Sequence, residues 1–166
     1  MYYKIQDFFD DWDYESKSTV KIFENLTDES LSVKVSPDVR SLGVLAWHIT
    51  LTLDEMMSKT GLHIDSPPQD SKHPSSVQEI KTAYEKASNS LVNEIKKTWN
   101  DESLNTEVDM YGSKWKNGVT LGVLLGHQAH HRGQMTVLMR QAGLKVPGIY
   151  GPSKEEWAAM GMPPME

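Results

Sequence analysis

Four long segments of this chain carry apolar residues at every third or fourth position, and this pattern limits the possible folds more than any other feature. The segments span about residues 5–26, 41–61, 76–99 and 120–143. Such spacing follows the period of an α-helix, about 3.6 residues, and gives each helix one face to bury. Four helices of roughly 18–25 residues each are the right size for a bundle with a shared core. The sequence therefore predicts an all-α protein, a four-helix bundle.

Residues that begin and end helices stand at the borders of these segments. Ser41 is a predicted N-cap of the second helix. Ser76 is followed three residues later by Glu79, a spacing typical of a capping box at the start of the third helix. Thr120 is the predicted cap of the fourth helix, and Gly143 is suited to follow its last turn.

Shorter elements are predicted between and after the long helices. A connection over 65–75, rich in proline and serine, separates the second helix from the third. Between residues 100 and 118 the apolar residues alternate around Tyr111-Gly112. This alternation predicts a small hairpin or loop insertion before the last long helix. Ser153 and Glu156 form another capping-box pair and predict a short C-terminal helix.

The bulk properties are those of a globular chain with one core. The 166 residues are 38% hydrophobic and 24% charged, and a chain of this length predicts a single domain over 1–166. The net charge of -6 argues against nucleic-acid binding, which needs clustered lysine and arginine. Acidic residues crowd positions 7–15, where a solvated helix face is the favoured interpretation.

The absence of cysteine and of long apolar segments excludes several kinds of site and bears on cellular location. The chain contains no cysteine, which excludes disulfides, a thiolate nucleophile and a cysteine-bound zinc. It has no run of about 18 apolar residues and no signal-peptide core at its start. We therefore expect a cytoplasmic protein without membrane association.

Histidines on two of the predicted helices form the strongest candidate site. His127 and His131 lie four positions apart, so on a helix they share one face, with Cβ atoms roughly 5–6 Å apart. An imidazole without a partner would be costly to bury in such an apolar segment. His48 occupies a corresponding face of the second helix, together with Thr52 and Glu55.

Three imidazoles from facing helices can hold a metal and leave a position for water or substrate. Zn²⁺ suits such ligands, and so do Ni, Fe and Cu, so the ligand set does not name the metal. A metal-free bundle with hydrogen-bonded core histidines is the alternative that the spacing leaves open.

Other polar residues beside the histidines have two interpretations each. Glu55 is a candidate acceptor for an imidazole N–H or a general base, or else a surface carboxylate at the helix end. Gln134 is a candidate partner of a ligand or of a histidine, or else a polar residue satisfied in the core. Arg132 points away from the histidine face, which favours a salt bridge or dimer contact, and His130 is expected at the edge of the site.

Several motifs resemble one known family in their order and spacing. They are the segment 41–49 (SLGVLAWHI), the segment 120–127 (TLGVLLGH), the H-x-x-x-H-R-G-Q block at 127–134, and the QAG and PG that follow at 141–143 and 147–148. Together they resemble the DinB-like family, a metal-binding four-helix superfamily that includes the YfiT-type proteins. The resemblance covers nearly the whole chain.

This resemblance implies a specific connectivity and a metal site. The implied bundle is connected up-down-down-up, and homodimers are frequent. The implied ligands are His48, His127 and His131, holding a divalent metal that is commonly Zn or Ni, with Mn or Fe as further candidates. Some members use low-molecular-weight thiols such as bacillithiol or mycothiol as S-transferases and isomerases. Other members are known only through induction under stress or DNA damage.

Two functional hypotheses follow from the residues and the resemblance together. The first is a metal-dependent enzyme that acts on a small-molecule substrate through thiol or small-electrophile chemistry. It would be an S-transferase or related hydrolase in stress response or detoxification, with Glu55 and Gln134 as candidate catalytic residues. The second is a non-catalytic stress-induced protein whose metal is structural or senses a ligand.

Overall fold

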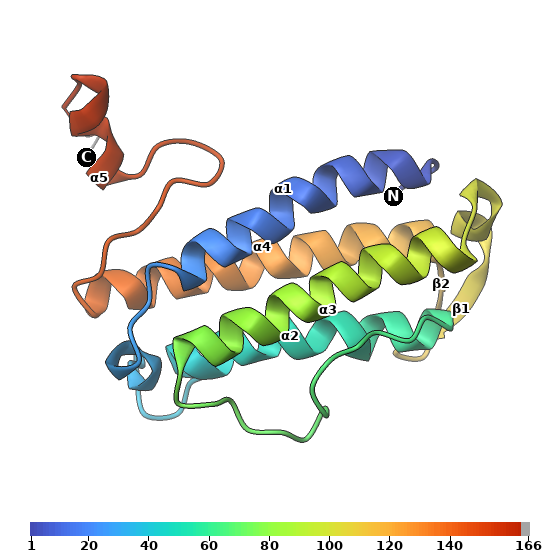
Figure 1. The fold of residues 1–166 in the computed structure, drawn as a ribbon, viewed down its shortest axis with the longest axis horizontal. Coiled ribbons are helices and arrows are strands. Elements are labelled where there is room, and N and C mark those ends of the chain that lie inside the picture. The colour runs from blue at the N-terminus through green and yellow to red at the C-terminus, as the bar shows by residue number, and fades with distance from the viewer. Residues whose placement is uncertain (164–166) are drawn as a thin grey trace.

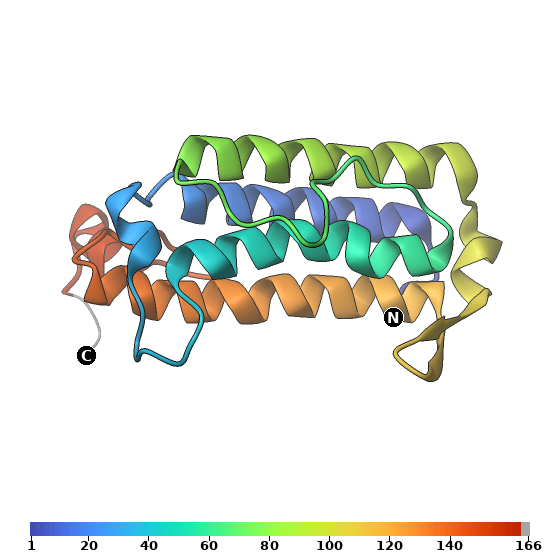
Figure 2. The same cartoon turned by 90° about the horizontal axis from the view of Figure 1, so that it is seen from below.

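Four long helices lie side by side and enclose the core of the bundle (Figure 1). The computed structural model describes residues 1–163. The helices are α1 (Ile5–Phe23), α2 (Leu42–Met57), α3 (Val77–Thr98) and α4 (Asn117–Gln141). α1 and α4 run in one direction while α2 and α3 run in the other, as Figure 2 shows from below. The predicted four-helix bundle and its up-down-down-up connectivity are therefore confirmed.

The helix neighbours follow from this connectivity. α2 packs against α3 and α4, and α1 packs against the same two helices. The parallel pair α2 and α3 needs a connection that returns along the bundle, and residues 61–76 provide it (Figure 2). Trp47 on α2 anchors this connection, because its indole Nε1 donates a hydrogen bond to the Ser71 carbonyl at 3.0 Å.

The predicted hairpin is present before the last long helix. β1 (Glu107–Met110) and β2 (Ser113–Lys116) pair antiparallel. Tyr111 and Gly112 form the turn, with φ values of 55° and 82°. A two-residue turn with both φ angles positive matches the twist of the paired strands. β2 leads directly into α4, so the hairpin sets where that helix begins.

The helix termini agree with the sequence in part. The Ser41 side chain accepts a hydrogen bond from the Val44 N–H at 3.3 Å, which confirms the predicted cap. Ser76 is the N-cap residue of α3, but its side chain makes no cap hydrogen bond, so the predicted capping box is wrong. The Val77 N–H of the first turn donates to the Asp28 carboxylate at 2.7 Å. Thr120 lies inside α4 and donates to the Lys116 carbonyl, so that predicted cap is wrong too.

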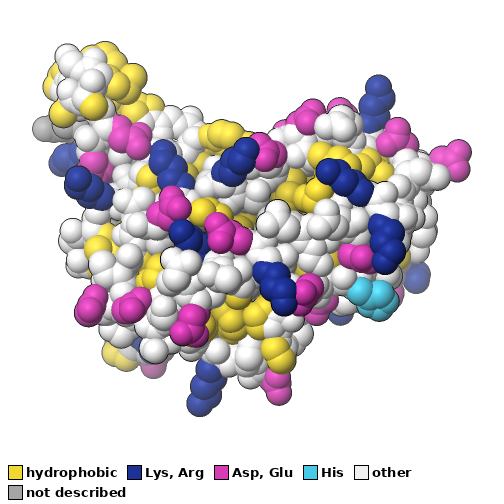
Figure 3. Space-filling model, in the orientation of Figure 1, with side chains coloured by type: hydrophobic (Ala, Val, Ile, Leu, Met, Phe, Trp, Pro, Cys, Tyr) yellow, Lys and Arg dark blue, Asp and Glu magenta, His cyan; other side chains and the backbone are white. Residues whose placement is uncertain are grey.

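The C-terminal part of the described chain forms the short helix that the sequence predicts. α5 spans Lys154–Trp157, and the Glu156 carboxylate accepts a hydrogen bond from the Ser153 N–H at 3.2 Å. Within residues 1–163, no helix combines the length and apolar character needed to cross a bilayer. Figure 3 shows positive and negative side chains interspersed over the face that carries α1 and α3.

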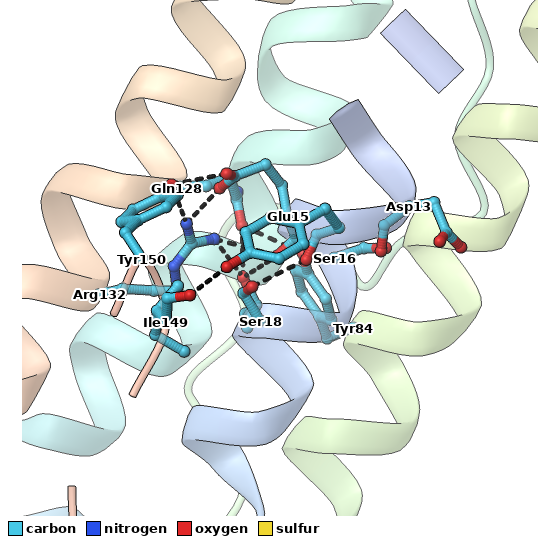
Figure 4. Close-up of polar contacts among 11 residues, drawn as sticks. Asp13, Glu15, Ser16, Ser18, Tyr84, Gln128, Arg132, Ile149 and Tyr150 are labelled. Carbon is cyan, nitrogen blue, oxygen red and sulfur yellow. Dashed lines mark hydrogen bonds and ion pairs between the residues drawn. The ribbon is translucent and has the colours of Figure 1, made fainter. Parts of the chain in front are cut away.

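A polar network is buried inside the bundle between α1, α4 and the C-terminal segment (Figure 4). The Arg132 guanidinium pairs with the Glu15 carboxylate and donates to the Thr19 hydroxyl at 3.0 Å. The Tyr150 hydroxyl donates to Glu15 at 2.6 Å and accepts from Arg132 at 2.9 Å. The prediction of a salt bridge for Arg132 is confirmed. The solvated position predicted for Glu15 is wrong, since its charge is neutralised in the core by a residue far along the chain.

Candidate metal centre

Three histidine side chains converge between α2 and α4. His48 lies on α2, and His127 and His131 lie one turn apart on α4. Nε2 of His127 is 3.2 Å from Nε2 of His48 and 3.1 Å from Nε2 of His131. All three ligand atoms lie within 4.8 Å of one another. The packing of α2 against α4 thus brings together residues that are 79 positions apart.

These distances fit one metal ion held by three imidazoles. A tetrahedral Zn²⁺ with Zn–N bonds of about 2.0–2.1 Å separates its ligand atoms by roughly 3.3–3.4 Å. The two close N–N distances of 3.1 and 3.2 Å are near this value. The three histidines are therefore placed so that they could bind a divalent metal ion.

The contacts of the ring nitrogens also favour a shared cation. Nδ1 of His131 lies 2.7 Å from the side-chain oxygen of Gln134. With Nδ1 as the donor, the neutral His131 ring has a lone pair on Nε2, pointing at its neighbours. His127 then contacts two other ring nitrogens through a single Nε2, which cannot form a full hydrogen bond with both. A cation at the common centre would satisfy all three nitrogens.

The surroundings keep the three rings neutral. Burial, together with smaller contributions from the nearby Arg40 charge and the two other histidines, lowers the pKa of His48 to about 4. Burial likewise lowers the pKa of His127 to about 4, with contributions from His131, His130 and Arg40. The pKa of His131 is also lowered, mainly by burial. Neutral imidazole is the form that binds a metal, so the site is in its ligating state near neutral pH.

Gln134 lies beside the three histidines, in agreement with its predicted role as a partner of one of them. Its oxygen accepts from His131, and its amide nitrogen lies 3.1 Å from Nε2 of the exposed His130. An acceptor on the distal ring nitrogen fixes the orientation and tautomer of a ligating histidine. His130 lies at the edge of the site, where the sequence predicted it.

Glu55 is placed differently from the histidines. Its carboxylate accepts a hydrogen bond at 2.7 Å from the Tyr111 hydroxyl in the hairpin turn. It is seven residues beyond His48 on the same helix, an axial displacement of about 10.5 Å. The group of close ligand atoms accordingly includes the three histidines and not Glu55. The structure therefore favours the alternative of a carboxylate at the helix end.

The histidines border two hollows on the surface. His131 and Gln134 line a hollow of about 590 Å³, while His48 lines another of about 460 Å³. Both volumes are in the range of sites for small molecules. Arg40 lines both hollows, and no motif in the sequence had assigned it a function. The only available signal was its place directly before the N-cap of the helix that carries His48.

Comparison with known proteins agrees with the fold and the motifs. The sequence profile of the DinB family matches residues 1–165. The chain belongs to the DinB family. It is 43% identical over 162 residues to YrdA of Bacillus subtilis, described as an uncharacterized protein, covering 98% of this chain and 97% of that one.

Two solved structures of DinB-like proteins are similar to this chain. One is a crystal structure from Bacillus cereus, 43% identical, with a TM-score of 0.87 over 90% of this chain and 100% of that one. The other is YjoA of Bacillus subtilis, 20% identical, with a TM-score of 0.67 over 89% of this chain and 99% of that one. The second similarity concerns the fold alone.

Proposed function

We propose that this DinB-family protein is a metal-dependent enzyme of thiol or small-electrophile chemistry, most simply an S-transferase used in stress response or detoxification. His48, His127 and His131 hold the metal, with Zn or Ni as the favoured ions. One observation carries the proposal: the three Nε2 atoms converge, and among residues 1–163 no carboxylate joins them as a fourth ligand. Three protein ligands and an open position are typical of catalytic zinc sites, whereas structural sites are closed by four.

The residues of this chain would prepare the site for such chemistry. A bound divalent ion would supply a thiolate or hydroxide nucleophile near neutral pH. The low pKa values of His48 and His127 keep both rings neutral and free to ligate. Gln134 holds the His131 ring with Nε2 toward the common centre. The hollow of about 590 Å³ beside His131 offers room for the electrophile.

A second candidate is a non-catalytic protein in which the metal stabilises the bundle. The ligands come from two helices, so a bound ion would cross-link α2 and α4. In that case a chelator would lower the melting temperature strongly, and no thiol would react faster in the presence of the protein.

The experiment compares metal content and thiol conjugation in one set of samples. Wild-type protein and the H127A variant are analysed for bound metal and then assayed with bacillithiol and 1-chloro-2,4-dinitrobenzene, each after loading with Zn, Ni, Mn or Fe. Sulfur attacks the ring carbon, chloride leaves, and the thiol proton passes to solvent. The H63A variant, which removes an exposed histidine from the connecting segment, is the matched control.

We expect metal and metal-dependent turnover in the wild type and in H63A, and neither in H127A. Bound metal without conjugation of bacillithiol in the presence of any of the four ions would overturn the enzymatic proposal and favour the stabilising role. Absence of metal from wild-type protein, even after loading, would overturn both.

A further inference from the structure

Arg40 lies where the two hollows beside the histidines meet. The larger hollow contains His131 at its wall, and the smaller contains His48. Arg40 lines both, so its side chain borders the same hollows as His48 and His131. Its charge also contributes, after burial, to lowering the pKa of His48, and it acts on His127 and His131 in the same direction.

The Arg40 guanidinium has no acidic partner within residues 1–163. No carboxylate oxygen lies within salt-bridge distance of it, whereas the chain's other arginines, Arg132 and Arg140, pair with Glu15 and Glu155. Arg40 is exposed, and a guanidinium presents a planar fork of donors that matches a carboxylate. Its donors are therefore available to a ligand.

The larger hollow combines this cation with apolar walls. Beside Arg40, His131 and Gln134, its lining includes five apolar side chains, Val35, Val39, Leu45, Val137 and Leu138. Three of these are unusually exposed for valine, at 59%, 44% and 53% for Val35, Val39 and Val137. Asp38 lines the same hollow and is its one acidic residue. A ligand here would contact an imidazole, apolar side chains and a cation.

We propose that Arg40 selects the substrate: it binds the carboxylate of a small ligand whose metal-binding atom reaches the histidine triad and whose apolar spacer lies along the valines. This inference rests on the proposed function, because it presumes a metal on His48, His127 and His131. It adds the ligand class, an anionic small molecule, and the residue that recognises it.

The test uses cobalt-loaded protein, because binding of a thiolate to Co²⁺ produces a charge-transfer absorption that reports affinity without turnover. The probes are 6-mercaptohexanoate and the neutral 6-mercaptohexanol, which share the thiol and the spacer. For the wild type we expect about tenfold tighter binding of the carboxylate, the effect of a charge-assisted hydrogen-bonded pair. In R40M we expect the two probes to bind with equal affinity, and in R40K part of the preference for the carboxylate remains.

Two further variants make the assignment to Arg40 specific. K72M removes a cation that lines only the smaller hollow, and we expect it to keep the preference. D38N removes the negative charge from the larger hollow and strengthens carboxylate binding. Equal affinities in the wild type, a preference that survives in R40M, or a preference lost in K72M instead would overturn the inference alone. Failure to bind Co²⁺ would overturn the proposed function together with it.

Discussion

Gln134 accepts a hydrogen bond from Nδ1 of His131 at 2.7 Å, and this contact sets which nitrogen of that ring faces the other two histidines. Both residues lie on α4, three positions apart, so the helix itself holds donor and acceptor together. The same amide reaches His130 on the solvent side. The ring orientation at the candidate metal centre therefore depends on an exposed glutamine outside the ligand set.

Replacing Gln134 tests this dependence. In Q134A the His131 ring loses its acceptor, and we expect metal affinity to fall roughly 10- to 100-fold, as for other acceptors behind ligating histidines. Competition with a chromophoric chelator measures the affinity. Q134E keeps an acceptor at the same place and should retain most of the metal affinity. Equal affinities in Q134A and wild type would show that packing alone orients the ring.

The lowered pKa values predict that metal-free protein loses stability in mild acid. His48 and His127 have pKa values of about 4 in the fold, against about 6.5 in the unfolded chain. Between pH 6.5 and pH 4 the unfolded chain binds more protons, so the free energy of unfolding falls as the pH falls through this window. Because both rings are partly exposed, we expect a loss of about 1–2 kcal/mol for each.

Urea unfolding of metal-free protein measures the loss, at about pH 7.0 above this window and at about pH 5.5 and 4.5 within it. The H127N variant, which has one imidazole fewer in the triad, should lose less than the wild type over the same range. Identical pH dependence in the two proteins would contradict the prediction.

The buried ion pair should be much more sensitive to substitution than an exposed one. Arg132 is 3% and Glu15 is 7% exposed, so R132M leaves a buried carboxylate without its cation and should cost about 3–5 kcal/mol of unfolding free energy. Chemical denaturation measures this cost. R140M removes an exposed pair with Glu155 and should leave the stability nearly unchanged.

Adding E15L to R132M should recover most of the loss, because an apolar replacement of both partners leaves no uncompensated charge. A double variant that is no more stable than R132M would mean that the remaining members of the network, such as Tyr150, depend on the pair.

Two glycines of α4 should respond in opposite directions to alanine. A Cβ at Gly118 would lie 2.3 Å from the Tyr2 carbonyl oxygen. The Tyr2 N–H also donates a hydrogen bond to the Gly118 carbonyl at 3.0 Å. G118A must displace the N-terminal segment, at an expected cost of about 1–3 kcal/mol. A Cβ at Gly126 meets no atom within 4 Å, so G126A should stabilise the helix by up to about 1 kcal/mol. Thermal melts of both variants would reveal any departure from these opposite signs.

The long helices could be predicted from the sequence because their signal is local. Apolar spacing located α1 to α4, and alternation around Tyr111-Gly112 located the hairpin. The helix ends were less predictable where their partner came from elsewhere in the chain. The first N–H of α3 bonds to Asp28, 49 positions away, and no local pattern around Ser76 encodes that contact.

The sequence by itself determined which histidines share a helix face, since four positions make slightly more than one turn. Only the tertiary structure decided that His48 meets His127 and His131, because this requires α2 to pack against α4 in one register. It also decided that Glu15 is buried against Arg132, that Glu55 bonds to Tyr111, and that Arg40 lies beside the triad. Backbone periodicity fixes the direction of a side chain on its own helix, whereas its partner depends on how separate helices pack together.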